Sequence, residues 1–401
     1  MEKIRQKLDP ITLGVFLVTL IIVLISLTTV VFPSLIMGTT DEIKYPVEID
    51  LFETGILAFP LLATNIILLI IGVLYFKNLL PQPIRKSINF ILNFEVPARI
   101  AFLVLITLIG LYIIFNVHEL IEVDPWEDFE RSVKDNLEKW AFGDISDLKR
   151  IVEFLGNLSM TVFGSYRVLP FIASVSLLVL TYAITYEISK KRFAGIIAVV
   201  IVLQSGIFSI YDSIITYSNF WILFYLLSLY LIFTKWSISP ISYILSILSK
   251  PMTVLFLPMT LFFILRCDYS NKHRVRLIIC YGIIVILGAV LLLIPNVIPN
   301  YSIDFDQRDF RNGFTSFSHE FRFDGLIVIF LLPVMVGFLF VSQNGIKNAD
   351  SVMVLIMGML LLAAIIPGFL SYTNTPYRFM PLVIFFAIGV GTLLSKRIRL
   401  T

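Results

Sequence analysis

Long apolar segments separated by short polar ones run along most of the chain. About 20 residues of helix are needed to cross the roughly 30 Å hydrocarbon layer of a bilayer. The pattern therefore predicts membrane spans at 12–34, 55–76, 97–116, 165–187, 193–211, 218–234, 275–296, 325–342, 351–371 and 378–395. The fold class that we expect is all-α, a polytopic integral membrane helical bundle of about 11–12 spans.

The apolar segment 238–266 is interrupted at Lys250-Pro251. Proline removes a backbone donor and disfavours helix at the residue before it, so we predict two short helices that form a hairpin. Irregular backbone at membrane depth is tolerated only where it is buried in protein or lines a cavity. The break therefore indicates a site, and the alternative is a plain helical hairpin with its proline turn at the far surface.

Basic residues gather in alternate connections, which predicts the orientation of the chain because cytoplasmic loops are rich in Lys and Arg. The basic connections include Lys3/Arg5/Lys7, Arg85/Lys86, Lys190/Lys191/Arg192, Lys272/Arg274/Arg276 and Lys396/Arg397/Arg399. We expect a multi-pass protein of the cell membrane with both termini cytoplasmic. The first apolar run is longer than a signal-peptide core and has no A-x-A cleavage site, so it is interpreted as a retained span.

The other connections include two long loops, 117–164 and 297–324, which the same rule makes extracytoplasmic. Between residues 125 and 154, apolar and charged residues interleave at helical spacing. We predict amphipathic surface helices there, with tryptophans at headgroup level. Two domains are expected, an N-terminal transmembrane helical pair at 1–96 and a transmembrane module at 97–401 that carries both loops.

Composition excludes several classes of protein. The 401 residues are 58% hydrophobic and 15% charged, against the roughly 25% charged residues usual in soluble chains. A net charge of +3, spread over short clusters, does not favour nucleic-acid binding. With three histidines, two cysteines and no P-loop or zinc-protease motif, the sequence does not favour a multi-histidine metal site and indicates no resident cofactor. Use of a divalent metal stays open as an alternative.

Five carboxylates crowd the exit of the span at 97–116, and they include Glu122 and Asp124. Carboxylates so close together repel one another unless they bind a cation or one takes up a proton, and a carboxylate at a membrane surface can accept a proton from a hydroxyl group. Asp124 and Glu122 are therefore the candidate catalytic residues. The alternative is an acidic loop that is merely solvated.

Ionisable residues within or beside spans are costly in a membrane and are candidates for function. They are Arg167, Asp212, Lys250 and Arg378, and the second long loop adds His319 and Glu320. Because the cations could converge on one anionic group, all six are candidate substrate-binding residues. Two alternatives stay open, snorkelling of Arg167 and Arg378 to the headgroups and a surface ion-pair network in the second loop.

From Pro97 to Arg397 the chain resembles the GT-C superfamily of membrane glycosyltransferases. The similar motifs are Glu122-Val123-Asp124 after a span, Tyr166-Arg167-Val168-Leu169-Pro170 opening another, Ile247-Leu248-Ser249-Lys250-Pro251, and Thr375-Pro376-Tyr377-Arg378-Phe379-Met380-Pro381-Leu382. The resemblance implies a mannosyltransferase-like enzyme. It would transfer a sugar from a polyprenyl- or dolichyl-phosphate donor to a lipid, glycan or protein acceptor outside the cytoplasm.

Within that resemblance, Asp124 would be the base of an inverting single displacement, and no cofactor would be required. Two other classes compete with a glycosyltransferase. One is a secondary transporter or lipid flippase with Lys250 and Asp212 in a central pathway, and the other is a non-catalytic subunit of a membrane complex.

Overall fold

The computed structural model describes residues 9–37, 50, 52–122, 129, 134, 150–293, 305–370 and 376–395, and these residues form helices and connections without strands. Within them, seven helices are long and apolar enough to cross a membrane. They are α1 (Pro10–Val31), α3 (Ala58–Phe76), α5 (Ala98–Asn116), α8 (Val168–Ser189), α16 (Gly325–Gln343), α17 (Asn348–Ile365) and α19 (Met380–Leu393) with the turn before it. The prediction of a polytopic helical membrane protein is confirmed.

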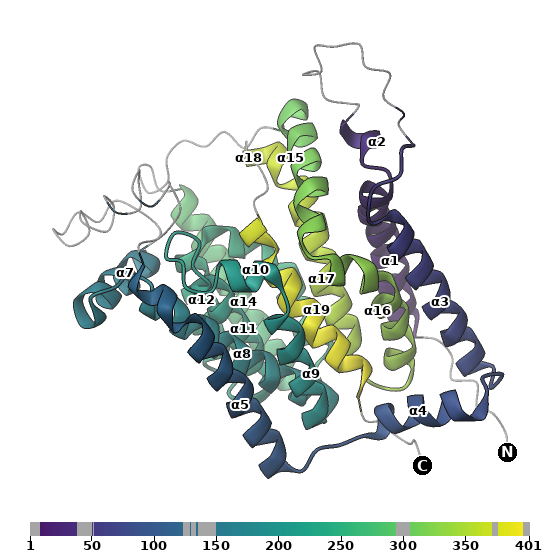
Figure 1. Cartoon of the computed structure of the whole chain (residues 1–401). Helices are drawn as coiled ribbons and strands as arrows, with labels where there is room; N and C mark the ends of the chain where they lie inside the picture. The colour runs from purple at the N-terminus through teal and green to yellow at the C-terminus, as the bar shows by residue number, and fades with distance from the viewer. Residues whose placement is uncertain are drawn as a thin grey trace.

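Shorter helices fill the bundle and cap its ends (Figure 1). They are α2 (Ser34–Met37), α4 (Gln82–Asn93), η1 (Val117–Ile121), α7 (Arg150–Phe163), α9 (Arg192–Leu203), α10 (Gly206–Ile210), α11 (Phe220–Thr234), α12 (Ser239–Ser249), η3 (Pro251–Phe256), α13 (Leu257–Arg266), α15 (Gln307–Glu320), η4 (Phe321–Phe323), α18 (Pro367–Leu370) and η5 (Pro376–Phe379). The 23-residue helix α14 (Asn271–Leu293) follows α13.

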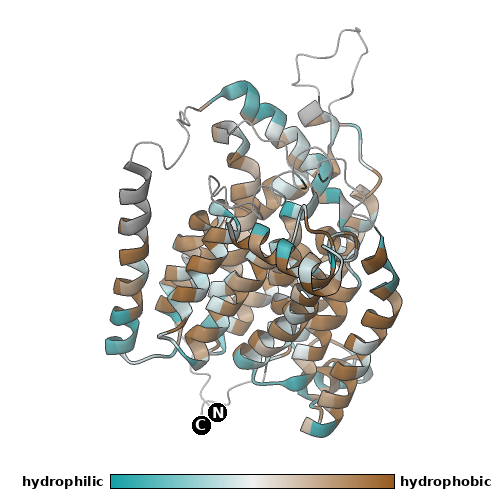
Figure 2. Cartoon of the chain, turned by 90° about the vertical axis from the view of Figure 1, so that its left-hand side faces the viewer, coloured by the Kyte–Doolittle hydropathy of each residue, from teal (hydrophilic) through white to brown (hydrophobic). Residues whose placement is uncertain are grey.

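The bundle has two distinct ends. Helix α1 begins and helix α19 finishes at the same end, which we call the terminal face, and α7 and α15 lie at the opposite end, the loop face (Figure 1). Hydrophobic residues cover the middle of the helices, and hydrophilic residues lie mainly near their ends (Figure 2). This distribution is the one that a bilayer requires of a multi-pass protein.

Helix α19 is the most enclosed of the seven long helices, and it packs against α8, α9, α16 and α17. Its approach to α9 depends on Gly391, where a Cβ atom would lie 2.8 Å from the carbonyl oxygen of Ala194. Small residues allow this close contact between helices in lipid, where apolar burial alone gives little driving force.

The predicted break at Lys250-Pro251 is confirmed. Helix α12 ends at Ser249, Lys250 is extended with φ −152° and ψ 106°, and the chain resumes as η3 at Pro251. Helix α13 then returns to the terminal face, where Arg266 in its last turn meets Asp9 beside the start of α1. The hairpin therefore has its break away from the face where both arms end.

The expected continuous span at 193–211 is wrong. Helix α9 ends at Leu203, and the five-residue helix α10 starts at Gly206. Between them, the Ser205 hydroxyl donates a hydrogen bond of 2.7 Å to the Asp324 carboxylate at the start of α16. The polar residues Gln204 and Ser205 and the following Gly206 interrupt the apolar run at this point, and the hydrogen bond joins the bend to the start of α16.

Helices α1 and α3 pack on the rest of the bundle, and α3 is fastened to α16 by an amide side chain. Pro333 lies inside α16 and has no N–H to donate to the carbonyl of Ile329, four residues earlier. The side-chain amide of Asn65, which is 4% exposed, donates to that carbonyl at 3.0 Å. One helix thus satisfies the acceptor that proline leaves open in its neighbour.

At the terminal face, a buried ion pair joins α1, α13 and α17. The guanidinium group of Arg266 donates to the carboxylate of Asp350, which is 0% exposed, and to Asp9 at 3.0 Å. The hydroxyl of Thr12 also donates to Asp350, at 2.8 Å. Removing one partner of a buried pair typically costs about 3–5 kcal/mol because an unpaired charge is left behind.

The predicted surface helices between 125 and 154 fall largely outside the described residues. Of that segment, Phe129 is buried in a cluster with Ala173, Ile215 and Phe220, and its ring lies 5.6 Å from that of Tyr166. The following helix, α7, packs its apolar side on α8 and α12. The start of the long loop is therefore anchored to the bundle through an aromatic side chain.

The bond between Asn65 and Ile329 yields a testable prediction. Asn65→Ala is expected to lower the free energy of unfolding by about 1–2 kcal/mol, the cost of leaving a buried carbonyl unsatisfied. Pro333→Ala restores a backbone donor to α16, so Asn65→Ala should cost much less in that background. Unfolding in detergent measures both costs. Equal costs in the two backgrounds would mean that the amide does not serve the proline gap.

Candidate functional site

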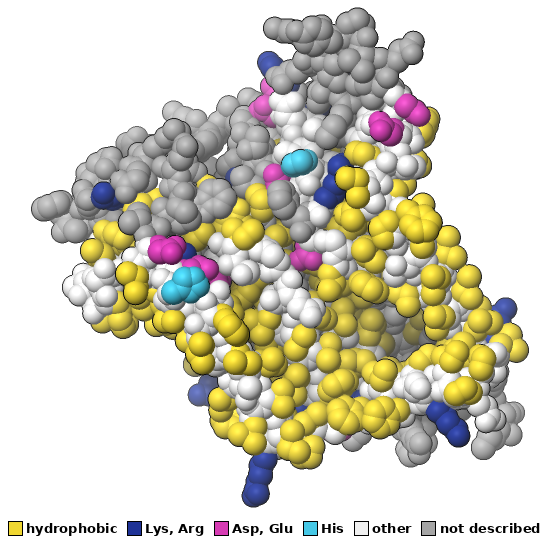
Figure 3. All heavy atoms as spheres, viewed as in Figure 1, with side chains coloured by type: hydrophobic (Ala, Val, Ile, Leu, Met, Phe, Trp, Pro, Cys, Tyr) yellow, Lys and Arg dark blue, Asp and Glu magenta, His cyan; other side chains and the backbone are white. Residues whose placement is uncertain are grey.

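Polar chemistry gathers at the loop face. In the space-filling view, the acidic and histidine side chains visible on this side of the molecule lie mainly in its upper part and around its middle, and apolar side chains cover much of the lower part (Figure 3). Within the upper part, two groups of described residues meet, one centred on Tyr377 and one on Arg167.

The first group, which we call the Tyr377 cluster, combines two cations with aromatic rings. The Nζ of Lys250 lies 4.2 Å from the ring centroid of Tyr377 and 4.6 Å from that of Trp221. The guanidinium carbon of Arg378 lies 5.7 Å from the Tyr377 ring, and the ring of Tyr217 stacks on it at 4.3 Å. The rings hold both cations close together, each contact being worth about 0.5–2 kcal/mol.

Each member of the Tyr377 cluster comes from an irregular or terminal position. Lys250 is the extended residue between α12 and η3, and Trp221 is in the first turn of α11. Tyr377 and Arg378 belong to the short helix η5. Main-chain breaks therefore deliver these side chains, because a residue in the middle of a packed helix would point at a neighbour. The cluster lies where four segments of the chain end or begin.

The second group, the Arg167 cluster, places a buried arginine beside several carboxylates. The Nη2 atom of Arg167 donates to Glu119 at 3.1 Å and to the Ser213 hydroxyl at 2.7 Å. The Nη1 atom lies 3.8 Å from the carboxylate of Glu122. Arg167 is 4% exposed, so the snorkelling alternative is wrong for this residue. Its Nε and Nη1 have no hydrogen-bond partner among the described residues.

Asp212 lies beside Arg167 in the connection between α10 and α11, and it is 0% exposed. The Tyr112 hydroxyl donates to its Oδ2 at 2.5 Å, and the Ser174 hydroxyl donates to its backbone carbonyl at 2.6 Å. Burial raises the pKa of Asp212 to about 6, although the Tyr112 hydrogen bond acts in the opposite direction. The carboxyl group is thus placed to exchange a proton near neutral pH.

Tyr211 joins the two clusters. It precedes Asp212 in the chain, and its ring lies 5.9 Å from that of Tyr217 and 6.0 Å from that of Tyr377. The Asn219 side chain fixes this connection by donating to the Tyr211 carbonyl at 3.2 Å and to Ser174 at 3.0 Å. The cationic and acidic groups are therefore adjacent parts of one region.

Glu320 ends α15 and approaches the same region. It lines a small cavity with Ile207, Asp324 and Phe379, and its buried Oε2 has no hydrogen-bond partner among the described residues. Burial raises the pKa of Glu320 to about 7. Its charge also contributes, after burial, to the raised pKa of Tyr211, which indicates that the two side chains are near each other. His319 is exposed on the same helix.

The structure brings several of the predicted site residues together. Lys250 and Arg378 share Tyr377, while Arg167, Asp212 and Glu122 share the Arg167 cluster. Asp124, the first candidate base, lies outside the described residues, two positions after Glu122. Sequence reasoning missed Tyr112, Trp221 and Tyr377 as members of the site. An aromatic residue in a membrane protein has no distinctive pattern, and only the proximity of Tyr377 to Arg378 in the sequence was a signal.

The described residues contain no group of three or more His, Cys, Asp or Glu side chains that could hold a metal ion. The groups they offer instead are two adjacent cations, several carboxylates and aromatic rings. Such a set can bind an anion and accept a proton next to it.

Comparison with known proteins finds no match among family models, curated proteins or solved structures. The class that fold and composition define is therefore a multi-pass helical membrane protein. Its function has to be inferred from the chemistry of the loop face.

The buried carboxyl group of Glu320 predicts a dependence of stability on pH. The unfolded chain ionises near the ordinary value of 4.5 and the folded protein near 7, so the protonated form favours folding and this stabilisation is lost as the pH rises through about 7. Glu320→Gln should match the wild type at pH 5 and melt about 1–3 °C higher at pH 8.

Asn312→Gln on the same helix is the control, because Asn312 is exposed and carries no titratable group, and it should keep the pH dependence of the wild type. Thermal unfolding in detergent at both pH values measures the difference. An unchanged pH dependence in Glu320→Gln would show that this carboxyl group is solvated.

Proposed function

We propose that the protein is a membrane glycosyltransferase that takes a sugar from a polyprenyl-phosphate donor and transfers it to an acceptor on the extracytoplasmic side. The observation that carries the proposal is the proximity of Lys250 and Arg378 around Tyr377, next to an acidic region that begins at the exit of α5. The GT-C resemblance of the motifs that contain these residues supports the same function.

The loop face is assigned to the extracytoplasmic side. The basic connections, including Arg85/Lys86 and Lys190 to Arg192, belong to the terminal face, and cytoplasmic loops are rich in such residues. A lipid-linked donor would then present its phosphate to the Tyr377 cluster from the outer leaflet, with its polyprenyl chain in the bilayer.

The two cations have a chemical role in this proposal. As the bond between the anomeric carbon and the phosphate oxygen breaks, negative charge grows on the phosphate. Lys250 supplies a point charge, and Arg378 supplies a planar donor group suited to phosphate. Because Tyr377 and Trp221 hold Lys250 in place before substrate arrives, little reorganisation is needed when that charge develops.

The acidic segment supplies the base. The acceptor hydroxyl attacks the anomeric carbon, its proton passes to a carboxylate, and the polyprenyl phosphate leaves with the electron pair of the broken bond. A single displacement of this kind inverts the anomeric configuration. We assign the base to Asp124, with Glu122 as the nearest alternative.

Arg167 has a positioning role in this mechanism. Its bonds to Glu119 and Ser213 tie the exit of α5 to the connection before α11. The Ser165 hydroxyl adds a second tie by donating to the Leu120 carbonyl at 2.6 Å. These contacts hold the start of the acidic segment beside Asp212 and Tyr211.

The assignment of the base is tested with Asp124→Asn, which keeps size and hydrogen bonding but removes basicity. Transfer from a polyprenyl-phosphate sugar should fall at least about 100-fold, the lower range for loss of a general base, while donor binding stays within about twofold. Glu122→Gln is the matched control. If Glu122→Gln abolishes transfer and Asp124→Asn does not, the base is Glu122.

The donor site is tested with Lys250→Gln, which should weaken binding of the polyprenyl-phosphate sugar by about 10- to 100-fold through loss of a charge-assisted contact. Lys190→Gln is the control, because Lys190 is exposed and pairs with Glu187 at the other end of the bundle. Donor titration of both purified variants measures the effect. Equal binding by both variants, with no transfer activity in the wild type, would favour the transporter or complex-subunit alternatives.

A further inference from the structure

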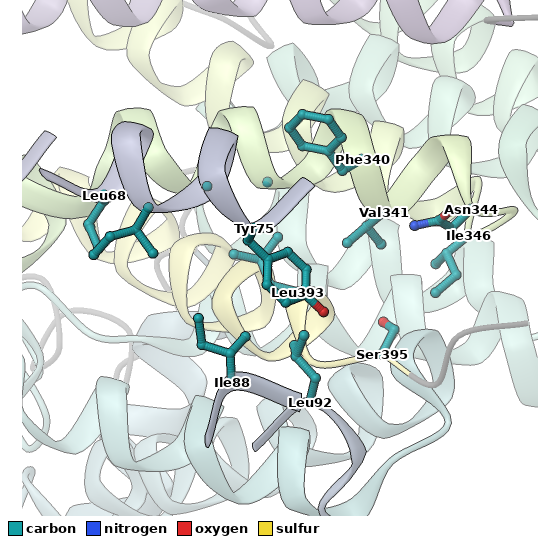
Figure 4. Close-up of a pocket in the computed structure, with 13 residues that line it drawn as sticks. Leu68, Tyr75, Ile88, Leu92, Phe340, Val341, Asn344, Ile346, Leu393 and Ser395 are labelled. Atoms are coloured by element: carbon teal, nitrogen blue, oxygen red, sulfur yellow. The ribbon is translucent and has the colours of Figure 1, made fainter. Parts of the chain in front are cut away.

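A lateral cavity of about 270 Å³ lies at the terminal face, far from the site described above. The last turns of α3 and α16 and the end of α19 form its walls, and α4 forms its floor (Figure 4). Its lining is predominantly apolar and includes Leu68, Ile71, Ile88, Leu92, Phe340 and Leu393. The volume is close to the lower end of ligand pockets, which run from roughly 300 to 1,000 Å³.

Helix α4 crosses the ends of the membrane helices as a strap (Figure 1). It has no buried residue, and it is held at defined points instead of by a packed face. The Tyr75 hydroxyl of α3 donates to Asn89 at 2.7 Å, and the Nζ of Lys191 donates to the Leu92 carbonyl. A strap fixed at these points leaves open space between itself and the bundle.

The cavity borders on surface that faces hydrocarbon. On α3, the neighbouring side chains Ile67, Ile70 and Val73 are 55%, 52% and 52% exposed, as expected of residues that contact lipid. Gly72 of the same helix lines the cavity, and a Cβ atom added there would meet nothing within 4 Å. The cavity therefore adjoins the lipid-facing side of α3, and Gly72 leaves open space there.

The strap carries charge of one sign. Between Gln82 and Asn93 it contains Arg85 and Lys86 and no acidic residue. Arg85 precedes Ile88 by three residues and Leu92 by seven, so the exposed guanidinium group shares a helix face with two residues of the cavity floor. Lys86 shares its face with Asn89, Phe90 and Asn93, which border a separate shallow groove.

We propose that this cavity binds one acyl chain of an anionic phospholipid from the leaflet at the terminal face, with the lipid phosphate on Arg85. The apolar lining takes the chain, and the positive strap selects the anionic headgroup. Residues 396–401 are the other candidate occupant, because they follow Ser395, which lines the cavity. They are basic, as the strap is, so their charge does not complement it.

The experiment uses the full chain in detergent, titrated with phosphatidylglycerol or with phosphatidylcholine of the same acyl chains, and native mass spectrometry counts the retained lipid. We expect one phosphatidylglycerol per chain and weaker retention of phosphatidylcholine. Gly72→Leu, which fills the cavity, should weaken retention by about tenfold. Gly110→Leu in α5 is the control, because a Cβ there also meets nothing within 4 Å.

The headgroup is tested separately on the exposed strap, where substitution does not disturb packing. Arg85→Gln should reduce the preference for phosphatidylglycerol by about fivefold, and Lys86→Gln by less than about twofold. Retention unchanged by Gly72→Leu, or equal retention of the two lipids, would overturn the proposal. If Gly72→Leu does not fold, an unchanged lipid preference in Arg85→Gln overturns it independently. Loss of phosphatidylglycerol retention on deletion of 396–401, with no effect of Arg85→Gln, would also overturn the proposal, because the basic residues 396–401 would then hold the headgroup.

Discussion

The hydrocarbon of a bilayer offers no hydrogen-bond partner, so every polar group placed within it has to be satisfied by the protein itself. The contact between Asn65 and the Ile329 carbonyl follows from this constraint, because Pro333 leaves that carbonyl without its helical donor. The pairing of Arg266 with Asp350 and Asp9 follows from it too. These contacts fasten α1 and α3 to helices that lie hundreds of residues later in the sequence.

The same constraint applies to the backbone breaks near the loop face. The break at Ser205 is compensated by Asp324, and the Thr253 hydroxyl donates to the Lys250 carbonyl at the break after α12. Such breaks free side chains from helix packing and direct them into one region. The function proposed for this face therefore depends on where the chain can stop being helical at acceptable cost.

The two faces of the bundle differ in chemistry. At the loop face, buried carboxyl groups lie beside cations held by aromatic rings, an arrangement suited to binding an anion and moving a proton. At the terminal face, the buried charges are paired for stability, and the open space is an apolar cavity under a basic strap. Reactive chemistry and lipid contact are thus proposed for opposite ends of the same helices.

The sequence by itself determined the membrane class, most helix bounds to within a few residues and the break at Lys250, because hydropathy and proline act locally. It also named Lys250, Arg378, Arg167 and Asp212, since a charge near a span is visible without a structure. Only the tertiary structure decided which of these charges lie together, and it showed that Tyr377, Trp221 and Tyr112 contact them. Aromatic residues are common in membrane helices, so their partners depend on how helices distant in sequence pack.

The helix that ends at Leu203 also shows where prediction from the sequence stops. The apolar run continues to Tyr211 after a short polar interruption at Gln204 and Ser205. At the bend, the Ser205 hydroxyl donates to Asp324, a partner 119 residues away. Local pattern predicts where a chain can be helical in a membrane, and only the assembled bundle decides where a distant polar partner makes it bend.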